Sequence, residues 1–294
     1  MIKSDMKFYN NAQIQADIDF LEFQIKKKGV KLIPDTGLQK LINECLSYIS
    51  LPPGAEIYNT TIKPLLVLYS LSDTLRMLWL KRKDFAVQLT AMNTGTYEYG
   101  IIGSGANDNN FKDFEFELFS AAYLNENGIN ADLPQHTLGN DIFYKDIEIQ
   151  CKHPEVFSRN KIDRFLRDLQ SSLNASQKYG ILGIGADDFL AFTDKSFPVD
   201  YGGFEKAYLS TLHQQDQIMQ EVYESTLPHC PRVLGVFTIN THFTFNEQMG
   251  LSLMKTTNSA FCFRQKAKEV PEETQIQAYE ILSIFNGKPS FRIF

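Results

Sequence analysis

The residues best suited to chemistry lie between Asp141 and Lys152, in the segment DIFYKDIEIQCK. β-Branched and aromatic residues flank Lys145 and Asp146, a pattern typical of a tight β-hairpin. Counting outward from that turn predicts the cross-strand pairs Tyr144–Ile147, Phe143–Glu148, Ile142–Ile149 and Asp141–Gln150.

One face of the predicted hairpin is polar. Opposed residues point to the same side of a strand pair, and side chains alternate along each strand. The polar face therefore holds Asp141, Glu148 and Gln150, with Lys152 beside them. The apolar face holds Ile142, Ile149 and Cys151. Because Mg²⁺ takes oxygen ligands, the polar face predicts a magnesium site with an ammonium group next to it.

A predicted helix over 111–127 points a carboxylate toward this hairpin. The helix follows Asn110, a good N-cap, and stops at Gly128, where a C′ glycine is expected. Glu117 lies within its apolar stripe of Phe114, Ala121 and Leu124. A core-facing carboxylate is costly unless it is paired or bound to metal, so Glu117 is the candidate acid of this helix. Glu115, on the other flank, suits that role less. The alternative is that Glu117 reaches solvent at the edge of the stripe.

A basic helix is predicted after the hairpin, over 159–177. Its apolar face consists of Ile162, Phe165, Leu166, Leu169 and Leu173. The candidate nucleic-acid contacts are its cations, Arg159, Lys161, Arg164 and Arg167. A solvated face is the alternative, because mixed charge on a helix usually means contact with water.

The whole sequence predicts an α/β protein in two parts. Residues 1–105 are expected to form a mainly helical domain, and the polar linker near Gly103 separates it from a domain over 106–294. In the second domain, 179–186 and 233–239 are expected to be buried strands, and glycines in the first would allow close packing. Residues 238–246 are expected to include a loop. A short strand at 259–264 and a final helix at 272–285 complete the expected elements.

Composition narrows the class of protein. The 294-residue chain is 43% hydrophobic and 22% charged, as in ordinary globular proteins. Its net charge of −6 argues against binding of nucleic acid by the whole surface, although a local basic groove is compatible with it. The four cysteines form no C-x-x-C pair, and the start lacks an apolar signal core. We expect a reduced, cytoplasmic protein that does not associate with a membrane.

Several short motifs together resemble the PD-(D/E)xK nuclease superfamily. They are Phe116-Glu117 with Gly128 eleven residues on, Gly-Asn-Asp141, and Ile-Glu-Ile-Gln150-Cys-Lys152-His-Pro. The resemblance covers roughly 111–186 and implies a restriction-endonuclease-like mixed sheet flanked by helices. It implies that Asp141 and Gln150 hold the metal, that Lys152 is the catalytic lysine and that Glu117 is the helix acid. The departure is Gln150, an amide where a carboxylate is usual, which leaves Glu148 as a compensating ligand.

The resemblance implies a Mg²⁺- or Mn²⁺-dependent DNA endonuclease. No motor motif of the P-loop type is present in the sequence, so a helicase, ATPase or sensor is the expected partner, in phage defence or restriction. The alternatives are a non-catalytic adaptor or nucleic-acid-binding subunit with a nuclease-like fold, and a nuclease acting on RNA. The sequence leaves homo-oligomerisation open.

Overall fold

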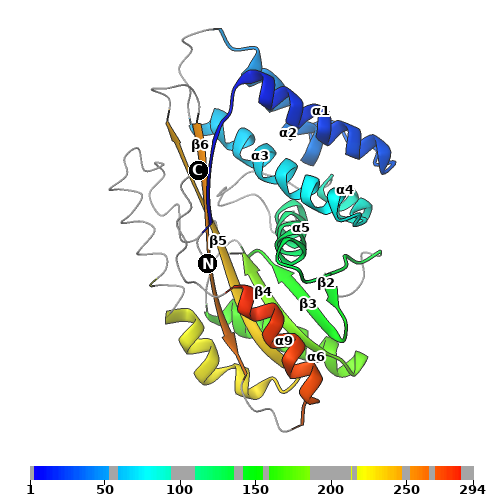
Figure 1. Cartoon of the computed structure of the whole chain (residues 1–294), viewed down its shortest axis with the longest axis vertical. Coiled ribbons are helices and arrows are strands. Elements are labelled where there is room, and N and C mark those ends of the chain that lie inside the picture. Colours follow the sequence, from blue (N-terminus) through cyan, green and yellow to red (C-terminus); the bar gives the residue numbers. More distant parts are fainter. Residues whose placement is uncertain are drawn as a thin grey trace.

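The computed structural model describes residues 3–52, 59–93, 110–135, 142–154, 159–185, 213, 217–246, 252–264 and 269–285. Its sheet has six strands in the order β1-β6-β5-β4-β3-β2 (Figure 1). They are β1 (Lys3–Phe8), β2 (Ile142–Tyr144), β3 (Ile147–Lys152), β4 (Tyr179–Gly185), β5 (Val233–Asn246) and β6 (Ser252–Phe263). Strands β3, β4 and β5 are parallel neighbours, whereas the pairs β2–β3, β5–β6 and β1–β6 are antiparallel. The predicted α/β class is confirmed.

Helices cover both faces of this sheet. They are α1 (Asn11–Lys27), α2 (Gly37–Ile49), α3 (Asn59–Leu80), α4 (Ala86–Met92), α5 (Asn110–Glu126), α6 (Arg159–Ser176) and α9 (Glu272–Ile284). α6 and α9 lie on opposite sides of the strands (Figure 1). One hydrophobic cluster joins α6 to Leu182 and Ile184 of β4. A larger cluster joins α5 and α9 to Ile149 and Cys151 of β3.

Local signals explain where the first and fifth helices begin and end. Asn10 and Gln13 form a reciprocal capping box at the start of α1, which satisfies backbone N–H groups that have no partner within the helix. Just beyond α1, Gly29 has φ +69°, and just beyond α5, Gly128 has φ +88°. Both are left-handed conformations that favour glycine. The predicted end of the helix at Gly128 is confirmed.

Two expectations about the rest of the chain have different outcomes. The loop expected within 238–246 is wrong, because β5 continues to Asn246, paired throughout with β6. The predicted boundary at 105 lies outside the described residues, so the division into two domains stays a prediction. Within the described part, β1 pairs with β6, and one hydrophobic cluster includes residues from both sides of that boundary, such as Leu71 and Ile149.

The structure also describes the cysteines and the character of the longest helices. All four cysteines are free and buried. Among the residues that the structure describes, no helix combines the length and the apolar character needed to cross a membrane.

Candidate functional site

The hairpin that carries the candidate site has the predicted turn and register. Lys145 and Asp146 form the turn, and Lys145 has φ +52°. The observed pairs are Ile142–Ile149, Phe143–Glu148 and Tyr144–Ile147. Asp141, the predicted first metal ligand, lies outside the described residues.

The polar residues of β3 form a row on the α6 side of the sheet. Their partners in the parallel strand β4 are Gly180 for Glu148, Leu182 for Gln150 and Ile184 for Lys152. Leu182 and Ile184 share a hydrophobic cluster with residues of α6, so this face is the one that α6 covers. Neighbouring members of the row are separated by about 6.6 Å, the rise of two residues in a strand.

Gln150 is the member of the row with unused hydrogen-bonding capacity. Its Oε1 atom is buried and has no hydrogen-bond partner within the described part of the chain. An orphaned buried oxygen of this kind requires an explanation, such as an ion or an ordered water. An amide oxygen is a suitable ligand for a hard cation, and by the observed register Asp141 is the next residue expected opposite Gln150.

Glu148 lies at the turn end of the row, where it is paired with a lysine. Lys178 Nζ is 2.7 Å from Glu148 Oε1, and the glutamate side chain is 6% exposed. The same ammonium lies 5.5 Å from the centroid of the Phe143 ring, which is opposite Glu148 in the hairpin. The proposed compensating role of Glu148 would require its carboxylate to be shared between Lys178 and a metal ion.

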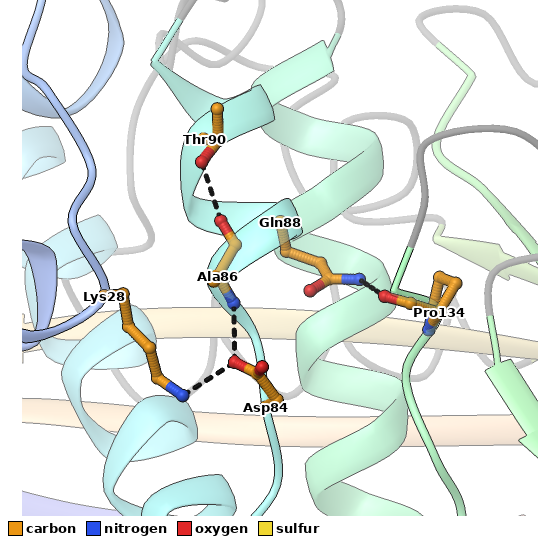
Figure 2. Close-up of polar contacts among 6 residues, drawn as sticks. All are labelled: Lys28, Asp84, Ala86, Gln88, Thr90 and Pro134. Atoms are coloured by element: carbon orange, nitrogen blue, oxygen red, sulfur yellow. Dashed lines mark hydrogen bonds and ion pairs between the residues drawn. The ribbon is translucent and has the colours of Figure 1, made fainter.

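Glu117 of α5 is buried, at 2% exposure. Its Oε1 atom accepts a hydrogen bond of 2.8 Å from Gln88 Nε2 of α4. Figure 2 shows that amide pointing toward the Pro134 carbonyl, at 3.4 Å. Because α5 packs against Ile149 and Cys151, its face of the sheet is opposite to the face of Gln150 and Lys152. The structure therefore does not bring Glu117 onto the face of the polar row.

Asp113, in the first turn of α5, is a half-buried carboxylate that was not among the residues predicted for the site. Its Oδ1 atom accepts a hydrogen bond of 2.8 Å from the backbone N–H of His153, directly after β3. Burial raises the pKa of Asp113, while the His153 N–H and then the charge of Lys152 act in the opposite direction. The Asp113 carboxylate thus interacts electrostatically with Lys152. Its position in the first turn of α5, opposite the end of β3, was the only available signal.

The candidate nucleic-acid contacts lie on the outer surface of α6. Arg159 donates a hydrogen bond of 2.7 Å to Ser225 Oγ and lies 3.9 Å from Asp163. Arg164 is 75% exposed and 3.8 Å from Asp168. Arg167 is exposed, and Lys161 is half-buried. The three arginines therefore face solvent, and Arg159 and Arg164 lie beside carboxylates of the same helix.

The described residues hold no cluster of three or more His, Cys, Asp or Glu side chains suited to a metal ion. Asp141 is not among those residues, so its contribution to such a cluster stays a prediction. Comparison with protein-family models, curated proteins and solved structures found no match to this chain.

Proposed function

We propose that this chain is a metal-dependent DNA endonuclease of the PD-(D/E)xK type. The observation that carries the proposal is that the Oε1 atom of Gln150 is buried and has no hydrogen-bond partner in the described part of the chain. Gln150 precedes Lys152 by two positions on β3, so both side chains lie on the same face of the sheet. We place the enzyme in the cytoplasm, in phage defence or restriction, with a helicase, ATPase or sensor as partner. This context rests on the resemblance alone.

The order of the secondary structure supports the proposal in part. After α5, Asp132 forms an isolated antiparallel bridge with Phe143 of β2, and β2 in turn pairs antiparallel with β3. α6 then connects β3 to the parallel strand β4. The described order is therefore α5-β2-β3-α6-β4, with an isolated bridge ahead of β2. It lacks one full strand of the α-β-β-β-α-β order that the resemblance implies, and the Gln-x-Lys motif lies on β3.

Gln150 and Asp141 have the oxygen-bearing side chains that a hard cation takes as ligands. Gln150 Oε1 and the Asp141 carboxylate would hold it, and water and a substrate phosphate would complete the ligands. When bound, Mg²⁺ supplies an activated water and neutralises the charge that develops on phosphorus oxygens. The Lys152 ammonium would orient the attacking water and stabilise the same charge.

Cleavage of DNA in Mg²⁺ or Mn²⁺ tests the proposal. The parent protein should cut DNA, whereas Asp141→Ala and Lys152→Ala should not. Lys145→Ala is the matched control, because Lys145 is an exposed lysine of the same hairpin, in its turn. Variants that cut DNA as fast as the parent protein would refute the assignment.

A non-catalytic adaptor is the second candidate. The pairing of Glu148 with Lys178 and the uncharged amide of Gln150 favour it, because together they lower the negative charge available to a cation. Titration with Mg²⁺ or Mn²⁺ separates the two functions. The adaptor should bind neither ion at millimolar concentration, even in the presence of DNA and the partner.

A further inference from the structure

Two helices of the N-terminal region end side by side, and each ends in cations. α1 packs against α3, and both run away from β1 in Figure 1. Lys28 Nζ, just after α1, lies 2.7 Å from Asp84 Oδ1, just after α3 (Figure 2). The cations at the two ends are Lys26, Lys27, Lys28, Lys81, Arg82 and Lys83.

Large apolar side chains are exposed among these cations. Trp79 is 44% exposed and Phe23 is 53% exposed. One ammonium connects the two rings, because Lys27 Nζ is 5.6 Å from the Trp79 ring centroid and 5.7 Å from that of Phe23. Phe23, Lys27 and Trp79 therefore belong to one surface. Together with Lys26, Lys81 and Arg82, the exposed cations that follow the two rings within three positions in the sequence, they are hereafter called the α1–α3 patch.

The charge of this patch is only partly neutralised. Lys28 and Lys83, at its border, are paired with Asp84 and Asp132. Lys26, Lys81 and Arg82 are exposed, and within the described part of the chain they form no ion pair. Cations at helix C-termini complement the helix dipole. That effect explains the charges, but it does not explain two exposed aromatic rings among them.

We propose that the α1–α3 patch binds single-stranded DNA. Proteins that bind single strands combine aromatic rings, on which bases stack, with cations that contact the phosphates. Trp79 and Phe23 would receive bases, and Lys26, Lys81 and Arg82 would contact the backbone. An acidic protein segment would match the charges, but it would leave the flat rings without a stacking partner. The choice of DNA rests on the proposed nuclease function, for which this patch would hold a single strand away from the site on β3.

Trp79 makes the proposal directly measurable, because it is the only tryptophan of the chain. A dT oligonucleotide should quench its fluorescence in EDTA, where no metal-dependent cleavage occurs. Added salt should weaken this binding, because counterions are released from the strand. Because binding in EDTA does not depend on cleavage, this experiment tests the α1–α3 patch independently of the proposed nuclease function.

Variants measured by anisotropy of a labelled dT oligonucleotide complete the test. Trp79→Ala should weaken binding at least about fivefold, and the triple variant Lys26→Ala/Lys81→Ala/Arg82→Ala should weaken it further. Lys40→Ala, on α2 and outside the patch, should bind as the parent does, and circular dichroism should show every variant folded. Unchanged affinity in both patch variants would overturn the proposal. Two other results would overturn it as well. One is that poly-glutamate quenches Trp79 as strongly as the dT oligonucleotide does, and the other is that the protein binds an rU oligonucleotide but not dT.

Discussion

At the residue scale, the orphaned oxygen of Gln150 links the structure to the proposed chemistry. A buried amide oxygen without a partner lowers stability unless an ion or a water satisfies it. The Oε1 atom of Gln150 is such an oxygen in the described part of the chain, whereas Glu148 of the same row already contacts Lys178. The amide is thus the row member best placed to accept a further ligand.

Gln150→Glu should strengthen metal binding. The added negative charge should lower the Kd for Mn²⁺ on the order of tenfold, which corresponds to about 1.4 kcal/mol. Titration calorimetry of the parent protein and of Gln150→Glu measures this change, with Gln150→Ala as the variant that lacks the oxygen. Equal Kd values for all three proteins would mean that Gln150 is not a ligand.

Lys178→Met should reduce the free energy of unfolding because Glu148 then loses its nearest cation. The loss should be about 1–2 kcal/mol, less than for a fully buried pair, since the lysine side chain is 48% exposed and water screens it. Urea denaturation measures it. In the double variant Glu148→Gln/Lys178→Met the loss should be smaller, because no buried carboxylate remains. Additive losses from the two single changes would show that the pair does not interact.

The sequence predicted the local pairing of the hairpin better than the contacts between distant segments. The register of the hairpin follows from its turn and from alternation, so Phe143 opposite Glu148 was predictable. The contact of Asp113 with His153 was not, because it joins residues 40 positions apart. Burial of Glu117 was predicted from its stripe, but the face of the sheet that α5 covers depends on packing that periodicity does not encode.

At the element scale, close packing between strands explains the glycines of β4. A Cβ atom built on Gly183 would lie 2.4 Å from Phe237 Cζ. The Phe237 ring is fully buried and stacks on Phe285 with centroids 3.9 Å apart, so it has little room to move. The expectation that these glycines allow close packing is confirmed. The loop expected at 238–246 was wrong because threonine and asparagine there pair with β6, a contact that local composition does not reveal.

Gly183→Ala should therefore destabilise the fold by about 1–3 kcal/mol, the usual cost of overpacking a core. Chemical denaturation should show a lower midpoint with an unchanged slope. Adding Phe237→Leu, which removes the ring, should restore part of the loss. A double variant less stable than the sum of the single changes would contradict this explanation.

The ion pair between Lys28, just after α1, and Asp84, just before α4, predicts that the stability of the fold depends on pH. The hydrogen bond from Lys28, followed by N–H groups of the α4 start, lowers the pKa of Asp84 below its ordinary value of 3.8. A carboxyl with a lowered folded pKa stabilises the fold above its unfolded pKa and loses that effect as pH falls through the folded value. Asp84→Asn should thus cost about 0.5–1 kcal/mol at neutral pH, since the Asp84 side chain is 49% exposed and water screens the pair. The difference should vanish in strong acid. A difference that persisted there would exclude this ion pair as its cause.

At the scale of the whole molecule, one sheet connects the two ends of the described chain. β1 pairs with β6, and α9 packs on the same face as α5. Neither contact was predictable from local sequence, because each joins segments more than 100 positions apart. The proposed nuclease row lies near the β2 edge of this sheet, and the α1–α3 patch lies on the helical layer that runs away from β1 (Figure 1).

The position of a bound metal ion tests the central claim most directly. Crystals grown with Mn²⁺ and a DNA fragment should show an anomalous peak about 2–2.5 Å from Gln150 Oε1. The same peak should contact the Asp141 carboxylate, with Lys152 beside a phosphate of the DNA. A protein that cuts DNA while its Mn²⁺ lies elsewhere, away from both residues, would contradict the assignment of the site to β3.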